Sequence, residues 1–310
     1  MPSLSVVVPT YQRRGSLPRF LEPLLADPAV SELVLAVDGS TDGTLEWLRE
    51  RARADPRIVA LDLPNRGAAA ARQAGIEAAS SEIVLLLDDD VIAAPELASG
   101  HARNHRDGAR RLVLGYMPTD WRALPPGRRG IAYLYNQAYE RQCARYARDP
   151  DFVLHGLWAG NLSLPRAEFV RIGMGENTVK RGEEDREFGI RCFKAGLDGR
   201  FDRTLLAAHD YDRTLTQYRR DCHMAGQSRR AMYELHGDVL GEDLALGHTL
   251  PGPLRRALPR LAGEPLFRLI APLLMMLFHI GVLLRSVKLE ALAARGLGSL
   301  ETQRGALEGV

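Results

Sequence analysis

Short apolar runs alternate with helix-spaced apolar positions along the N-terminal part of the chain. Four runs rich in Val, Leu and Ile end at turn-forming residues, which is typical of strands buried on both faces of a sheet. These runs are Leu4–Val8, Leu33–Val37, Ile58–Leu61 and Ile83–Leu87. Helical spacing between them predicts helices over Leu17–Leu25, Thr44–Ala52 and Ala68–Ala79. This order predicts an α/β fold with an open, mostly parallel sheet flanked by helices.

The pattern changes after Gly115. Apolar and aromatic residues at helical spacing predict a long helix over 127–149, and residues 154–173 predict a strand, a turn and a short helix. Residues 182–201 predict a helix that is closed by Gly196 and followed by a strand. We predict one continuous domain with halves 1–115 and 116–236, followed by a helical C-terminal region at 237–310.

The C-terminal region contains an apolar run from Leu269 to Leu284, which Pro272, His279 and Gly281 interrupt. A helix that spans a membrane needs about 20 apolar residues, so spanning ranks third among the interpretations. Two others have equal weight. The run is a buried helical hairpin or an oligomer contact, or it is an amphipathic segment that touches a membrane surface through residues 266–285.

Composition excludes several classes of protein. The chain has 310 residues, of which 45% are apolar and 26% charged, and its net charge of +2 comes from scattered basic residues. No basic patch for nucleic acid is therefore expected. The three cysteines, Cys143, Cys192 and Cys222, form no CxxC pair, which argues against a disulfide framework or a zinc site and fits a reducing cytosol. The N-terminus lacks the features of a secretory signal, so we predict a cytoplasmic protein, or one peripheral to the inner face of the cytoplasmic membrane.

Polar clusters follow three of the predicted strands, with the sequences PTYQRR, DGSTDG and DDD. In open α/β sheets, ligands bind beyond the carboxyl ends of the strands, so a site is expected there. Asp88 and Asp90 of the last cluster point to the same side of an extended chain, and paired carboxylates suit a divalent cation, Mg²⁺ or Mn²⁺. The alternative is a solvated acidic turn pinned by an arginine; the position at the end of a buried strand favours the cation.

Two other positions offer groups for a phosphorylated nucleoside. Asp38 ends a strand and can accept hydrogen bonds from a ribose or a base, although an ordinary turn before a helix is the alternative. Gly67 lets the chain turn into a helix from which Arg72 projects, and arginine binds phosphate with two parallel hydrogen bonds. A solvated arginine on an alanine-rich helix is the alternative for Arg72.

The stretches SVVVPTYQR, VDGSTDGT, NRGAAAARQAG and LLLDDDVIAAP, in this order, resemble the nucleotide-sugar-binding half of family 2 glycosyltransferases with the GT-A fold. The resemblance covers the chain up to about residue 100. It implies a set of donor-binding residues, Pro9, Tyr11, Asp38, Arg72, Asp88 and Asp89, and metal ligands Asp90 and Asp88. Val37 and Gln73 depart from the pattern, where the family often has Asp and Asn, and this leaves the details of nucleoside contact open.

The second half resembles the acceptor side of the same family. Gly156–Phe169 is similar to its GxNxSxxR segment, which implies acceptor contacts from Trp158, Gly160 and Asn161. Gly182–Gly196 is similar to its ED motif, with Glu184 and Asp185 in register. The resemblance assigns Asp185 as the general base, with Glu184 helping to hold the acceptor. The alternative, acidic residues that favour a helix N-terminus, is the interpretation we accept for Glu183.

Two later positions refine the prediction. His209 resembles a late histidine that completes the metal site in some relatives, and a structural histidine is the alternative. The sequence GQSRRA, residues 226–231, is similar to the QxxRW signature of processive synthases, but Ala231 stands in the Trp position. A non-processive enzyme is therefore expected.

The resemblance thus implies an inverting, metal-dependent transfer of a sugar from a nucleotide diphosphate, foremost a UDP-sugar, to a hydroxyl of a glycan or lipid-linked acceptor. Self-association into a homo-oligomer is left open. One alternative is a degenerate relative that serves as a membrane-associated scaffold, against which Asp88, Asp90 and Asp185 argue. A sugar-nucleotide pyrophosphorylase is less favoured, because VVVPTYQRRGS lacks the glycine-rich signature with lysine that such an enzyme needs.

Overall fold

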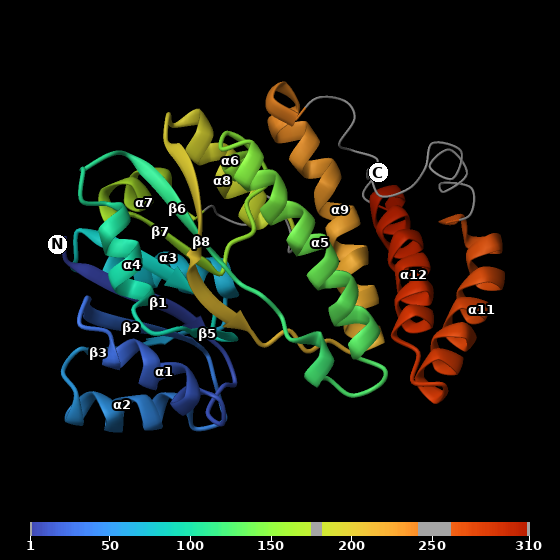
Figure 1. Ribbon diagram of the computed structural model, residues 1–310, viewed down its shortest axis with the longest axis horizontal. Coiled ribbons are helices and arrows are strands. Elements are labelled where there is room, and N and C mark those ends of the chain that lie inside the picture. Colours follow the sequence, from blue (N-terminus) through green and yellow to red (C-terminus); the bar gives the residue numbers. More distant parts are fainter. Residues whose placement is uncertain (1, 175–181, 241–261, 309–310) are drawn as a thin grey trace. The chain divides into compact units, whose positions relative to one another are not determined.

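The computed structural model describes residues 2–174, 182–240 and 262–308 (Figure 1). The chain forms two compact units. The first comprises Met1–Pro118, Gln142–Asn177 and Arg191–Asp210, and the second comprises Thr119–Arg141, Thr178–Ile190 and Tyr211–Val310. The predicted boundaries at residues 115 and 236 remain predictions.

The first unit is built on a mixed, mostly parallel sheet whose strand order is β3-β2-β1-β4-β7-β6-β8-β5. Its strands are β1 Leu4–Thr10, β2 Val30–Asp38, β3 Ile58–Leu63, β4 Ile83–Leu87, β5 Val91–Ala93, β6 Arg111–Tyr116, β7 Asn161–Pro165 and β8 Asp198–His209. Strands β3, β2, β1 and β4 run parallel to one another, and β7 is antiparallel to both of its neighbours. The predicted fold class, a helix-flanked α/β sheet, is confirmed.

The N-terminal strands and helices follow the sequence pattern closely. Every residue of β1 and β4 is buried, which explains their near-continuous apolar sequence. The helices of this part are α1 Leu17–Ala26, α2 Thr44–Ala54, α3 Ala68–Ala78 and α4 Leu97–Asn104. Helix α3 lies so close to β1 that a Cβ on Gly75 would come within 2.5 Å of Val7 Cγ1. The predicted strands and helices of this part are confirmed in type and order.

The prediction for residues 154–173 is only partly right. The segment contains β7, but α7 (Arg166–Ile172) follows the strand directly, without the predicted turn. Pro165 allows this junction, because its fixed φ of −55° suits the residue before a helix. The sequence pattern missed α6 (Phe152–His155), since a four-residue helix is too short to show a helical period. Helix α8 (Glu184–Lys194), Gly196 in a left-handed conformation and β8 are as predicted.

The second unit is helical in its described residues. It contains the short η1 (Trp121–Ala123), the beginning of α5 (Arg129–Arg148), and α9 (Leu215–Leu240), α11 (Glu264–Leu283) and α12 (Val287–Glu308). Helices α9 and α12 approach closely at glycines: a Cβ on Gly226 would lie 2.0 Å from Thr302 O. Helices α11 and α12 run side by side, as the orange and red ribbons of Figure 1 show.

A carboxylate from the end of the chain caps the start of α5. Glu290 of α12 is buried, and its Oε2 accepts hydrogen bonds from the backbone N–H groups of Gly127 at 3.2 Å and Gly130 at 2.9 Å. The first N–H groups of a helix have no partner within the helix, and a negative charge suits that end. Gly130 must be glycine here, because a Cβ would lie 2.2 Å from Glu290 Cβ.

Candidate functional site

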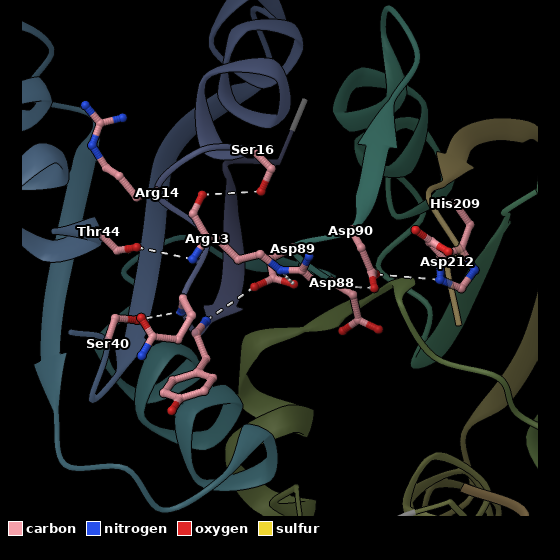
Figure 2. Close-up of polar contacts among 12 residues, drawn as sticks. Arg13, Arg14, Ser16, Ser40, Thr44, Asp88, Asp89, Asp90, His209 and Asp212 are labelled. Carbon is pink, nitrogen blue, oxygen red and sulfur yellow. Dashed lines mark hydrogen bonds and ion pairs between the residues drawn. The ribbon is translucent and has the colours of Figure 1, made fainter. Parts of the chain in front are cut away.

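The three adjacent carboxylates after β4 each meet a positively charged or ionisable group within the first unit. Arg72 of α3 donates to Asp88 Oδ1 at 2.6 Å. Arg13 donates from Nε to Asp89 Oδ1 at 3.0 Å and from Nη2 to Asp90 Oδ2 at 3.5 Å. These contacts, drawn in part in Figure 2, show how the chain tolerates three neighbouring negative charges at the edge of its core.

Arg13 is positioned by a hydrogen-bonded junction between the loops that follow β1 and β2. Gln12 has a positive φ of 55°, which turns the chain sharply after β1. The N–H of Gln12 donates to Ser40 Oγ at 2.9 Å, and the N–H of Arg13 donates to Thr44 Oγ1 at 3.3 Å. The predicted polar cluster DGSTDG therefore fixes the loop that presents Arg13.

Asp89 is largely shielded from solvent, with 14% of its side chain exposed. Burial raises the pKa of Asp89 to about 6, although the charge of Arg13 pulls that pKa down. Its Oδ2 accepts a hydrogen bond from the N–H of Tyr11 at 3.3 Å. Asp89 thus ties the loop after β1 to the end of β4, whereas Asp88 and Asp90 face Arg72 and His209.

Asp90 and His209 are the best candidates for metal ligands. His209 Nε2 lies 3.6 Å from Asp90 Oδ1, beyond hydrogen-bond length and at a separation that two ligands of one cation can have (Figure 2). The described residues contain no group of three or more His, Cys, Asp or Glu arranged around a metal position. The residues present therefore fit a divalent cation only as a partial set, which phosphate oxygens of a ligand and water would complete.

Asp38 has a backbone-binding role that the sequence did not indicate. The side chain is buried, and its two carboxylate oxygens accept the N–H groups of Arg66 at 2.8 Å and Gly67 at 2.9 Å. The loops are also in direct contact, since a Cβ on Gly39 would lie 2.8 Å from Asn65 Cβ. Asp38 thus holds the loop that leads into α3, the helix that carries Arg72.

Gly160 lies directly against Asp88. Its carbonyl oxygen accepts the N–H of Asp88 at 3.1 Å. With φ at +125°, it has a conformation that only glycine adopts easily, and a Cβ there would lie 3.0 Å from both Asp88 Oδ2 and Met117 Sδ. Gly160 therefore makes room for the Asp88 carboxylate, a contact that the acceptor assignment did not foresee.

Asn161 belongs to the core, which corrects the prediction that it contacts an acceptor. Its side chain is fully buried, Nδ2 donates to Leu205 O at 3.0 Å, and Oδ1 lies 2.9 Å from His101 Nε2. Both ends of the amide already have hydrogen-bond partners, one on β8 and one on α4. Any effect of Asn161 on an acceptor has to be indirect.

The hydrogen-bond directions of this buried network can be assigned from its ends. Burial lowers the pKa of His101 to about 3 and that of His105 to about 4, so both rings are neutral. Because Asn161 Oδ1 must accept, His101 carries its proton on Nε2 and its Nδ1 accepts from Ser163 Oγ at 2.8 Å. Ser163 Oγ in turn accepts from His105 Nε2 at 2.8 Å. The chain of bonds ties α4 to β7 and fixes the strand that Gly160 precedes.

The remaining predicted residues lie in different places. Pro9 is buried within β1, and Tyr11 is about half exposed at its end. Trp158 is half-buried in the loop before β7. Glu184 and Asp185 begin α8, as predicted, in the part of the chain that belongs to the second unit. Glu184 accepts a hydrogen bond from the N–H of Gly182. The catalytic roles of Glu184 and Asp185 stay predictions.

Arg13 is the residue that the sequence reasoning missed. It stands in the quoted cluster PTYQRR at the end of the first strand, beside Arg14, and the pattern does not distinguish the two. In the structure Arg14 instead lies over the ring of Trp47, 4.8 Å from its centroid. The sequence carries no signal that separates them, because the chain turns at Gln12 and does not continue as an extended strand.

Comparisons with known proteins find relatives that include the segment with the three carboxylates. Residues 5–155 match the model of the glycosyl transferase family 2. The chain is 24% identical over 259 residues to the uncharacterized glycosyltransferase YfnE of Bacillus subtilis (strain 168), an alignment that covers 66% of this chain and 64% of that protein. It is 30% identical over 230 residues to validoxylamine A glucosyltransferase of Streptomyces hygroscopicus subsp. limoneus, covering 64% of this chain and 49% of that one. The chain therefore spans about half to two thirds of the length of these relatives.

A solved structure shares the fold. The mannosyltransferase PcManGT from Pyrobaculum calidifontis, in complex with GDP-Man and Mn²⁺, superposes with a TM-score of 0.57 at 16% identity, covering 95% of this chain and 86% of that one. The family match includes β1, β2 and β4 and the three carboxylates that follow β4. Over residues 5–155, the chain is similar to glycosyl transferase family 2.

Proposed function

We propose that this protein is a metal-dependent glycosyltransferase that moves a sugar from a nucleoside diphosphate to an acceptor hydroxyl. The observation that carries the proposal is the carboxylate triplet at the carboxyl end of β4, held by Arg13 and Arg72 within the segment that matches the family. A parallel sheet presents its ligand site at this edge. The relatives that transfer glucose or mannose support the reaction class but not a particular sugar.

The donor would bind at the ends of β1, β2 and β4. Tyr11 is exposed there and offers an aromatic face to a base, while Asp38 holds the loop beside it. Arg72 and Arg13 are the cations nearest to the triplet, and both can donate to phosphate oxygens. We propose a UDP-sugar as the donor, with dTDP- and GDP-sugars as the alternatives to be tested.

A divalent cation, Mg²⁺ or Mn²⁺, would be held by Asp90 and His209, with Asp88 as a further candidate ligand. When bound, such a cation supplies positive charge that stabilises the leaving diphosphate. The protein's own contribution is to hold these side chains: the N–H of Asp210 donates to Asp90 O at 2.8 Å, and β5 pairs with β8 at Val91 and His209. The backbone thus fixes both candidate ligands through neighbouring strands.

The chemical step proposed is a single displacement with inversion. The acceptor oxygen attacks the anomeric carbon, the bond from that carbon to the diphosphate oxygen breaks, and Asp185 takes the proton of the acceptor hydroxyl. Asp185 lies in the first turn of α8. Glu184, its neighbour, is proposed to help hold the acceptor, and so are Trp158 and the loop around Gly160.

The proposal is tested by calorimetric titration of the full chain with UDP, dTDP and GDP, each in Mn²⁺, Mg²⁺ or EDTA. We expect one nucleotide to bind in the presence of metal and not in EDTA. The Asp90→Asn variant should lose this metal-dependent binding. Asp107→Asn is the matched control, because the exposed Asp107 pairs with Arg111 at the start of β6, at the edge of the sheet opposite the triplet. If no nucleotide binds under any condition, the transferase proposal fails.

A second candidate, a degenerate family member that acts as a binding module, draws on one observation. Arg13 and Arg72 already occupy the carboxylates, and the described residues show no three-ligand metal group. If the protein is a degenerate binding module, Asp90→Asn should leave its binding to a partner unchanged, and neither form should hydrolyse a nucleotide-sugar. Metal-dependent turnover that the same variant abolishes would exclude this candidate.

A further inference from the structure

Helix α11 carries an exposed stripe of large apolar side chains. Leu269 exposes 67% of its surface, Leu273 60% and Leu283 82%. We call the set the outer stripe; it consists of Leu266, Leu269, Leu273, Met276, Ile280, Leu283 and Leu284. Contiguous apolar patches of this kind are rare on soluble monomers and mark a surface that meets another apolar phase.

The outer stripe is not the face by which α11 joins its own unit. Phe267, Ala271 and Phe278 lie on the other side of the helix and are buried against α12 and its neighbours. Gly281 packs against the backbone of α12, where a Cβ would lie 2.8 Å from Glu290 N. The helix is therefore apolar on two sides: one side is covered within the unit and the other is exposed.

The exposed charged side chains within residues 265–289 are all positive. Arg268, Arg285 and Lys288 are exposed near its two ends, and residues 265–289 contain no Asp or Glu. The stretch Pro265–Leu283 has a mean hydropathy of 2.1, and only 22% of it is buried. By length and composition it is the one stretch among the described residues that meets the criteria for crossing a membrane.

We propose that the outer stripe rests on the surface of a membrane that contains anionic lipids, with α11 lying in the plane of the interface. Apolar side chains enter the boundary of the acyl chains there, and flanking basic side chains bind the headgroups. The proposal is independent of the catalytic one. It selects the interfacial interpretation from the two that the sequence leaves open.

Two other arrangements fit less well. A spanning hairpin of α11 and α12 would carry Arg295, exposed on α12, and the ion pair of Glu301 with Arg219 into hydrocarbon, which is costly. Pairing of two copies through the stripe suits its alternating spacing of three and four residues. In either orientation, however, such a pair would bring Arg268, Arg285 and Lys288 near their like-charged counterparts, and like charges repel.

The test is sedimentation of the full chain with vesicles of phosphatidylcholine alone or with added phosphatidylglycerol. We expect binding to the anionic vesicles, and a loss of about tenfold or more in Leu269→Ser/Leu273→Ser, since two inserted side chains are removed. Leu292→Ser is the matched control: Leu292 is 60% exposed but lies on α12, outside the stripe, so binding should be unchanged. Because the substituted positions are exposed, circular dichroism should show both variants folded.

Three results would overturn the proposal. The first is absence of binding to anionic vesicles, or binding that the double variant leaves unchanged. The second is a dimer in light scattering that Leu269→Ser/Leu273→Ser converts to a monomer without vesicles, which would assign the stripe to self-association. The third is vesicle-bound protein that resists extraction at high salt and alkaline pH, which would indicate a spanning helix.

Discussion

Replacement of Gly160 by alanine should damage the donor site more than it damages the fold. The substitution imposes a side chain at a φ of +125°, which costs about 1–3 kcal/mol of stability. The new Cβ would lie 3.0 Å from Asp88 Oδ2 and 3.0 Å from Met117 Sδ, closer than ordinary contact distance. One of these groups has to move by a few tenths of an ångström or more, and Asp88 also holds Arg72 at 2.6 Å.

Gly196→Ala provides the matched control for this prediction. Gly196 also has a positive φ, of +74°, but a Cβ there would meet no atom within 4 Å. It should therefore lose about 1–2 kcal/mol of stability from backbone strain and keep its ligand affinity. Urea denaturation measures the first quantity for both variants, and calorimetric titration with the metal–nucleotide pair measures the second.

The magnitude expected for Gly160→Ala is a loss of nucleotide affinity or turnover of about tenfold to a hundredfold, because small displacements of a positioned group have effects of this size. Equal destabilisation of the two variants, together with unchanged nucleotide binding and donor hydrolysis in Gly160→Ala, would refute the contact with Asp88 as a functional constraint.

Three further predictions concern the charges and the buried network. Asp89→Asn should stabilise the metal-free protein near neutral pH by up to about 3 kcal/mol, since a pKa raised from 3.8 to about 6, with the attraction to Arg13 already included, corresponds to about that free energy. Arg13→Ala should raise the affinity for Mn²⁺ in the absence of nucleotide, measured by calorimetry, because Arg13 then no longer competes for Asp90. Asn161→Ala should cost about 2–4 kcal/mol in urea denaturation, because it leaves more than one buried polar group without its partner.

The sign of the Asp89 effect follows from proton binding. Between about pH 4 and pH 6 the folded protein keeps a proton on Asp89 that the unfolded chain releases, so stability from this group falls as the pH rises through that window. The advantage of Asp89→Asn in EDTA should therefore vanish below about pH 4, and an advantage that is constant with pH would contradict the assignment. For Arg13→Ala the control is Arg14→Ala, which should leave Mn²⁺ affinity unchanged. Asn161→Ala with undiminished stability would mean that the network is not structural.

The N-terminal half of the fold was predictable because its strands are buried on both faces. Runs such as Ile83–Leu87 leave little choice of structure, and the polar clusters after them mark one edge of a parallel sheet. The pairing of arginines with carboxylates at that edge was not predictable. The sequence shows three carboxylates, but which arginine faces which carboxylate depends on the turn at Gln12 and on contacts with Ser40 and Thr44.

The acceptor motif shows the limit of motif-based assignment. Gly160 and Asn161 occur at the expected positions, yet their observed contacts are with Asp88, Leu205 and His101. Whether a short polar side chain faces a ligand or the core depends on the neighbouring strand. Leu205 lies on strand β8 and follows Asn161 by 44 residues. A local pattern contains no information about such a partner.

The cap that Glu290 provides for α5 has a consequence for synthesis of the chain. The N–H of Gly130 donates to Glu290, which follows it by 160 residues. At about 5–20 residues per second, a ribosome needs roughly 8–32 s to add them, and during that time the N–H of Gly130 lacks the carboxylate that accepts its hydrogen bond in the folded chain. The helix start is therefore completed only after the whole sheet has been made. A message cut short before codon 290 would yield a chain whose α5 never acquires this cap.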